Sequence, residues 1–279
     1  MKYSVSNWIF GKEPLERGIE RIARLGYDAV ELKGEPEELK RANVYQVLDK
    51  YNVRVSSICG MYPWPTDSRD LSSDRREVRD AAVRYVKECI DFARSLSAAV
   101  VIVSPSPVAK LNPSSDKKTD WKNAVESVKR IAEHTEKQNV LIGIEAINRY
   151  EVYLVSTAED ALKFIDEVNS SNVKVMLDCF HMNIEESDLG SAIRKVGPEL
   201  INLHITDSNR RAVGKGHIDF KSVMRALKDI NYSYYLTMEP LPSVSDPYIA
   251  MNTQLPGKIH DNILTECIEL LQMYERVIE

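Results

Sequence analysis

The chain has too few cysteines to be built on disulfides. Its 279 residues contain four of them, and no two form a C-x-x-C pair: Cys59, Cys89, Cys179 and Cys267. Disulfide scaffolds are much smaller and much richer in cysteine. We therefore expect reduced thiols, the default in the cytosol, and a cytoplasmic protein.

Long apolar runs and an excess of positive charge are also missing. No segment approaches the roughly 18 apolar residues that a membrane helix needs, and the N-terminus lacks the apolar core of a secretion signal. Asp and Glu outnumber Lys and Arg by 42 to 37, which gives a net charge of -5. Surfaces that bind nucleic acid are usually basic. We expect neither a membrane nor nucleic acid among the partners.

A dinucleotide-binding G-x-G-x-x-G is absent after the first apolar run. What the chain does have is alternation: apolar runs typical of β-strands are separated by amphipathic helical patterns, the clearest at 77–96, 121–136 and 220–230. This order predicts a single closed (β/α)8 TIM barrel over residues 1–279, with an open doubly wound sheet as the alternative. The eight predicted strands are 3–8, 28–33, 53–60, 99–104, 140–146, 173–179, 200–206 and 233–239.

Two features refine this plan. Ser156-x-x-Glu159 and Asp74-x-x-Glu77 predict helix starts of the capping-box type. Three long segments follow predicted strands, at 61–73, 105–120 and 240–259, and therefore belong to the mouth of the barrel. In such barrels the loops of the mouth carry substrate contacts.

Four consecutive strands end on residues that bind metals. These residues are Glu145, Asp178, His204 and Glu239, at the ends of the runs VLIGIE, VKVMLD, LINLH and YYLTME. Parallel strands of a barrel present their carboxyl ends at one rim, so the four side chains should converge. Buried carboxylates are costly without a compensating charge. Three carboxylates and one imidazole predict one divalent cation, with Mn²⁺ favoured and Co²⁺ or Mg²⁺ as alternatives.

Such a site suits proton transfer at carbon. Four protein ligands leave positions for two adjacent oxygens of a hydroxy-ketone, whose neighbouring C–H the metal would acidify. Glu145 and Glu239 come from different strands and can flank a substrate from two sides. One carboxylate can take a proton from one face while the other returns a proton to the opposite face, which inverts the carbon.

Five stretches surround or follow these candidate residues: GIEAINRYE (143–151), DCFHMNIEE (178–186), HITDSNRR (204–211), GKG (214–216) and MEP (238–240). They resemble the ketose 3-epimerases, a family of xylose-isomerase-like barrels that acts on tagatose, psicose and ribulose. The resemblance covers essentially the whole chain. It implies metal-dependent epimerisation of a free ketose at C3 through a metal-bound cis-enediolate, and a homodimer or homotetramer.

Site residues carry over by position. Glu145, Asp178, His204 and Glu239 match the family's metal ligands, and Glu145 with Glu239 also match its acid/base pair. Three further matches are implied substrate contacts: Glu151 and His181 near O1 and O2, and Arg210 on the oxygens beside the metal.

Two aromatic residues are candidates for the substrate wall, because sugars pack well on aromatic surfaces. They are Trp8 at the end of the first strand and Tyr62 after the third.

Departures from the family leave the substrate open. Val213 precedes the G-x-G, Cys179 stands where threonine is common, and SPSP occupies 104–107 where relatives often carry glycines. A sugar phosphate therefore stays possible as substrate.

An aldose–ketose isomerase and an inosose-type keto-polyol dehydratase are alternatives that need the same metal and base. A multi-zinc DNA-repair endonuclease is disfavoured by the five histidines and the negative charge.

Overall fold

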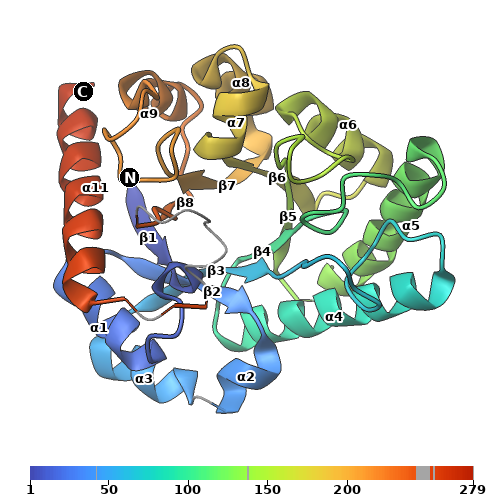
Figure 1. The fold of residues 1–279 in the computed structure, drawn as a ribbon, viewed down its shortest axis with the longest axis horizontal. Helices are drawn as coiled ribbons and strands as arrows, with labels where there is room; N and C mark the ends of the chain where they lie inside the picture. The colour runs from blue at the N-terminus through green and yellow to red at the C-terminus, as the bar shows by residue number, and fades with distance from the viewer. Residues whose placement is uncertain (42, 137, 243–251, 254, 279) are drawn as a thin grey trace.

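Eight parallel strands close into a barrel, in which β1 pairs with β8 as well as with β2 (Figure 1). The computed structural model describes all residues except 42, 137, 243–251, 254 and 279. The predicted closed barrel is confirmed, and the open sheet is excluded. The strands are β1 (Lys2–Ser6), β2 (Ala29–Gly34), β3 (Arg54–Gly60), β4 (Val100–Val103), β5 (Leu141–Glu145), β6 (Val173–Asp178), β7 (Leu200–Ile205) and β8 (Tyr235–Met238).

Helices surround the barrel and connect successive strands (Figure 1). Within the described part of the chain, none of them combines the length and the apolar character that a membrane crossing requires. The α-helices are α1 (Leu15–Arg24), α2 (Pro36–Arg41), α3 (Val44–Tyr51), α4 (Arg76–Ser95), α5 (Lys117–Thr135), α6 (Ala158–Val168), α7 (Cys179–Glu185), α8 (Leu189–Val196), α9 (Phe220–Asp229) and α11 (Gly257–Val277), and the 3-10 helices are η1 (Asn7–Phe10) and η2 (Gly197–Glu199).

The predicted helix starts need two corrections. The capping box of α6 is formed by Thr157 and Asp160, one residue later than predicted, with the Thr157 side chain accepting from the Asp160 backbone N–H. At α4 the N-cap is Arg75, and no side chain caps the helix there. Both polar pairs match the motif by spacing, but the position of the preceding strand and loop decides which residue reaches the first free N–H groups.

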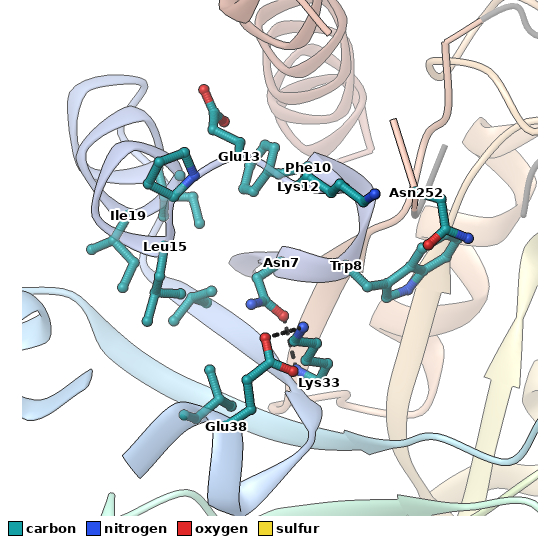
Figure 2. Close-up of a pocket in the computed structure, with 16 residues that line it drawn as sticks. Asn7, Trp8, Phe10, Lys12, Glu13, Leu15, Ile19, Lys33, Glu38 and Asn252 are labelled. Carbon is teal, nitrogen blue, oxygen red and sulfur yellow. Dashed lines mark hydrogen bonds and ion pairs between the residues drawn. The ribbon is translucent and has the colours of Figure 1, made fainter. Parts of the chain in front are cut away.

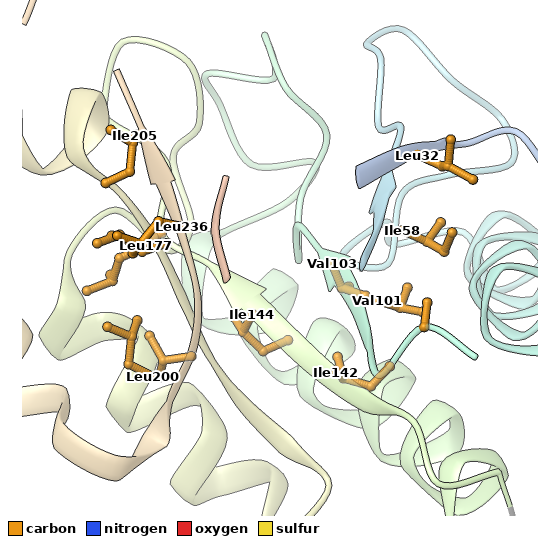
Figure 3. Packing of buried hydrophobic residues seen from close by; sticks show 14 of the residues in the cluster. Leu32, Ile58, Val101, Val103, Ile142, Ile144, Leu177, Leu200, Ile205 and Leu236 are labelled. Atoms are coloured by element: carbon orange, nitrogen blue, oxygen red, sulfur yellow. The ribbon is translucent and has the colours of Figure 1, made fainter. Parts of the chain in front are cut away.

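Side chains of one strand alternate between the outside and the inside of the barrel. One set packs with helix residues such as Ile90 and Phe164 in a single large core cluster. Figure 3 shows part of this set, and the strand residues that it labels are Leu32, Ile58, Val101, Val103, Ile142, Ile144, Leu177, Leu200, Ile205 and Leu236.

The interior of the barrel has two different sides. Toward β3–β7, a small second cluster is apolar and contains Cys59, Val100, Ile102, Met176 and Ile201. Toward β1–β3, β7 and β8, the buried interior residues are mostly polar and include Ser4, Glu31, Ser57, Asn202 and Thr237. Burial of a polar group is costly without a hydrogen bond, so the polar side must be an organised network.

The loops after β3, β4 and β5 are tied to one another on the mouth side. The Val108 N–H donates to the carbonyl of Tyr62 at 2.8 Å, and the Ala109 N–H donates to the carbonyl of Glu151 at 2.7 Å. These bonds hold the first two predicted long loops against the segment that carries Glu151. Half of the third, 240–259, lies outside the described residues.

Candidate active site

The four predicted ligands meet at the carboxyl-terminal rim of the barrel. Glu145 and Asp178 are the last residues of β5 and β6, His204 is the penultimate residue of β7, and Glu239 directly follows β8. The register pairs Asp178 with His204, so these two lie side by side. The ligand atoms of Glu145, Asp178 and His204 lie within 4.8 Å of one another. Glu239 joins them, because its Oε2 is 3.1 Å from His204 Nδ1.

Burial dominates the electrostatics of two of the carboxyl groups. It raises the pKa of Glu145 to about 8 against the opposing charge of His204, and the neighbouring charges of Glu239 and Asp178 add to the rise. Burial also raises the pKa of Asp178 to about 6, although Arg210 opposes it. Both carboxylates therefore lack sufficient positive charge from the protein itself, which is the environment that a bound cation stabilises.

For Glu239 and His204, the neighbouring charges shift the pKa more than burial does. Burial alone would raise the pKa of Glu239, but the charge of His204 and the nearby Arg210 lower it. Burial alone would lower the pKa of His204, but Glu239 and Glu31 raise it well above the ordinary value. Three carboxylates around one imidazole thus fit a divalent cation by donor type and by charge.

Arg210 lies against this cluster from the loop after β7. Its Nη1 is 3.0 Å from Asp178 Oδ2 and 3.5 Å from Glu239 Oε2, and its guanidinium lies 4.4 Å from the ring centre of Phe180. The backbone of Arg210 has a φ of 59°, which is uncommon for a residue with a side chain. A tight turn, in which the Arg210 N–H donates to the Asp207 carbonyl at 2.9 Å, holds this conformation.

His181 and Glu151 form a second group beside Asp178. His181 is buried in α7, with its Nε2 3.7 Å from Asp178 Oδ2. Asn148 connects the pair, because its Nδ2 lies 2.7 Å from His181 Nδ1 and donates to Glu151 Oε1 at 3.0 Å. An amide donor at Nδ1 places the imidazole proton on Nε2. Burial, followed by the charges of Arg210 and His204, lowers the pKa of His181 well below the ordinary value.

The two predicted wall aromatics lie in different environments. Trp8 Nε1 donates to Glu239 Oε1, and the indole borders a cavity of about 500 Å³ between η1, α1 and β2 (Figure 2). Tyr62 is only 4% exposed and packs edge-to-face on Tyr85, with ring centres 5.8 Å apart. Among the described residues its buried hydroxyl has no hydrogen-bond partner. Trp8 thus contacts the cluster directly, whereas Tyr62 is held in the wall between β3 and β4.

Sequence reasoning missed three polar residues of this region. Glu31 lies in the interior of β2 and contacts His204, Asn148 connects His181 with Glu151, and Lys110 is buried beneath the mouth loops. A charge inside an apolar strand was the available signal for Glu31. For Lys110 there was none, because its local sequence is typical of a solvated loop.

Comparison with known proteins places this arrangement among related barrels. A family model described as xylose isomerase-like TIM barrel matches residues 19–251. The chain is 33% identical over 229 residues to the D-psicose 3-epimerase of Ruminiclostridium cellulolyticum, with 80% of this chain and 76% of the relative covered. It is 31% identical over 248 residues to the D-psicose 3-epimerase of Enterocloster bolteae, with 86% and 82% covered.

A solved structure of such an enzyme has the same fold as this chain. The D-psicose 3-epimerase of Clostridium cellulolyticum H10, crystallised with D-tagatose, matches with a TM-score of 0.87 and 26% identity, and 99% of each chain is covered. The similarity therefore covers nearly the whole chain.

Proposed function

This chain belongs to the xylose isomerase-like TIM barrels and, within them, to the ketose 3-epimerase family of isomerases; from that membership we propose that it epimerises a ketose sugar at C3 with a divalent metal ion and two glutamates. The observation that carries the proposal is the convergence of Glu145, Asp178, His204 and Glu239 on one rim, with the first three offering ligand atoms within 4.8 Å. A small-molecule sugar is the proposed partner.

The same four residues would hold the cation, for which Mn²⁺ is favoured and Co²⁺ or Mg²⁺ are alternatives. When bound, the cation polarises the ketose carbonyl and acidifies the hydrogen at the neighbouring carbon. Its positive charge also compensates the buried carboxylates, whose charged forms burial disfavours at Glu145 and Asp178.

Glu145 and Glu239 are the proposed acid/base pair. They come from β5 and the end of β8, which lie on different sides of the rim. One carboxylate takes the C3 proton, which leaves an enediolate, and the other delivers a proton to the opposite face of C3. The electron pair of the broken C–H bond enters the enediolate and returns to form the new C–H bond, so atoms and electrons balance.

The neighbouring residues orient the sugar in this proposal. Arg210, which already lies 3.0 Å from Asp178 Oδ2, would donate to the oxygens beside the reacting carbon. His181 and Glu151, connected by Asn148, would bind the oxygens at the C1 end. Trp8 and Tyr62 would form the wall, with the Trp8 indole, which donates to Glu239 Oε1, next to the reacting carbon.

Isotope exchange tests the function directly. With Mn²⁺ in D₂O and a panel of free ketoses that includes D-psicose, D-tagatose and L-ribulose, we expect deuterium at C3 together with the C3 epimer, detected by NMR. Deuterium at C1 would instead identify an aldose–ketose isomerase, and loss of water would identify a dehydratase. Phosphorylated ketoses in the same panel test for a sugar-phosphate substrate.

Metal removal gives a second prediction. Dialysis against EDTA should abolish the exchange, and added Mn²⁺ should restore it. Because a ligand that binds only the folded state stabilises it by mass action, Mn²⁺ at 100 times its Kd should add about 2.7 kcal/mol to the free energy of unfolding. A higher Tm in a thermal scan would show this effect. Asp178→Asn is the control, for which added Mn²⁺ should no longer raise Tm; an equal rise in both proteins would contradict the assigned site.

A further inference from the structure

The charged residue Glu31 is completely buried inside the barrel. It lies in β2 between Val30 and Leu32, whose side chains belong to the outer core cluster, so Glu31 points to the interior. Its exposed fraction is 0%. Glutamate is almost never fully buried without a partner, because removal of its charge from water is very costly. The side chain must therefore have a specific role in the interior network.

Three donors converge on one oxygen of Glu31. Ser57 Oγ donates to Oε2 at 2.7 Å, Asn202 Nδ2 donates to it at 3.1 Å, and His204 Nε2 lies 3.1 Å from it. The other oxygen, Oε1, lies 3.0 Å from the same Nε2. The carboxylate therefore faces one ring nitrogen of His204 with both oxygens, while Ser57 and Asn202 hold it in place.

The second ring nitrogen of His204 points to the opposite side. Its Nδ1 lies 3.1 Å from Glu239 Oε2, and His204 belongs to the group whose ligand atoms lie within 4.8 Å together with Glu145 and Asp178. No described residue makes a well-aligned hydrogen bond to this nitrogen. The imidazole thus stands between Glu31 on one side and the three rim carboxylates on the other.

We propose that Glu31 is a positioning residue for the metal centre. Its carboxylate accepts the Nε2–H of His204 and so keeps the Nδ1 lone pair directed at the cation. A carboxylate behind a metal-binding histidine fixes the tautomer and the ring orientation, and its loss typically lowers metal affinity 10- to 100-fold. This inference rests on the proposed function only in requiring that a cation binds at the rim.

A competing assignment makes Glu31 itself a ligand. Its Oε1 has no hydrogen-bond partner among the described residues, and Glu31, Cys59 and Glu239 also offer ligand atoms within 4.8 Å of one another. In that arrangement Cys59 would contribute as much as Glu31, and His204 would have no fixed tautomer. The two assignments therefore differ in what they predict for Cys59 and for the protons of His204.

Glu31→Gln is the decisive variant, because glutamine keeps the shape of the side chain. Its carbonyl oxygen can take the place of Oε2 and still accept from Ser57 and Asn202. Its NH₂ group then takes the place of Oε1, 3.0 Å from His204 Nε2, where it meets the Nε2–H donor to donor; this contact and the loss of the negative charge favour a proton on Nδ1 instead. A protonated Nδ1 cannot bind a metal. We expect the Kd for Mn²⁺, measured by EPR of the free ion, to rise about 10- to 100-fold.

Two further measurements keep the inference testable if Glu31→Gln does not fold. Cys59→Ala should bind Mn²⁺ as tightly as the wild type; a rise in Kd of about 10-fold or more would favour the Glu31–Cys59–Glu239 site and overturn the proposal. In the wild-type protein loaded with diamagnetic Mg²⁺, ¹⁵N NMR of the histidine rings should show His204 protonated at Nε2 alone. A proton on Nδ1 in that spectrum would also overturn the proposal.

Failure of this inference is distinguishable from failure of the proposed function. If the wild type binds Mn²⁺ and Glu31→Gln binds it equally well, the role of Glu31 is wrong while the metal centre stands. If the wild type binds no Mn²⁺ at all, both are overturned.

Discussion

Glu239→Gln is expected to abolish epimerisation while the barrel stays folded. Glu239 Oε2 lies 3.1 Å from His204 Nδ1, and Oε1 accepts from Trp8, so an amide of the same shape fits the site. The amide cannot take or return a proton. Removal of a positioned acid/base group lowers turnover by about 10²–10⁴-fold, and the weakened metal ligation adds to this loss. Steady-state assays at saturating Mn²⁺ and circular dichroism would measure both effects.

Exchange of the C3 hydrogen with D₂O separates the roles of the two glutamates. In Glu239→Gln, Glu145 is intact and should still exchange the C3 hydrogen of one epimer with D₂O, although no product forms. Glu145→Gln should show the reverse, with exchange confined to the other epimer. Glu159→Gln, at an exposed position on α6, is the control and should behave as the wild type. Full turnover in Glu239→Gln, or exchange of both epimers in each variant, would contradict the two-glutamate assignment.

The barrel and the convergence of the four candidate ligands were predictable because they follow from local rules. Apolar runs of strand length alternate with helical patterns, and this order leaves few topologies. Once the strands are parallel and closed, Glu145, Asp178, His204 and Glu239 must share a rim, whatever the packing between them. Each predicted strand is found within about two residues of its expected ends.

Other parts of the site could not be predicted, since they depend on contacts between distant residues. Glu31 and His204 are 173 positions apart and meet only through the closure of the barrel. The shift of the capping box from Ser156 to Thr157 has the same origin, because both residues satisfy the local preference and the fold selects one. The burial of Tyr62, a candidate for the substrate wall that is 4% exposed, likewise depends on packing against Tyr85 from another element.

The role of Lys110 could not be predicted either, because it depends on contacts between loops that are distant in the sequence. This lysine is 2% exposed, yet it carries a charge beneath the loops of the mouth. Its Nζ donates to Asp70 Oδ2 at 2.7 Å and to Ser114 Oγ at 2.8 Å, and lies 3.7 Å from Asp120 Oδ2. Tyr153, from the loop after β5, donates to the same Asp120 oxygen at 2.6 Å. The ammonium group of Lys110 and the aspartates around it thus connect the loops after β3, β4 and β5.

Lys110→Met is expected to destabilise the fold by about 3–5 kcal/mol, because it leaves two buried aspartates without their counter-ion. The exposed pair of Lys195 with Glu159, 2.8 Å apart, provides the matched control. Lys195→Ala should cost less than about 1 kcal/mol, since solvent screens such pairs. Urea unfolding of the two variants would measure the difference, and equal stabilities would show that the buried network contributes nothing.

Lys110→Met should also weaken substrate binding. The segment around Lys110 is bonded through its backbone to both proposed substrate-contact regions, with Val108 N–H on the Tyr62 carbonyl and Ala109 N–H on the Glu151 carbonyl. When the charge that holds these loops is lost, the wall and the Glu151 segment lose their fixed positions, but the four candidate metal ligands on β5–β8 keep theirs. We therefore expect KM for the ketose to rise more than kcat falls, with Mn²⁺ affinity unchanged. A fall in Mn²⁺ affinity would contradict this separation of the loop network from the metal centre.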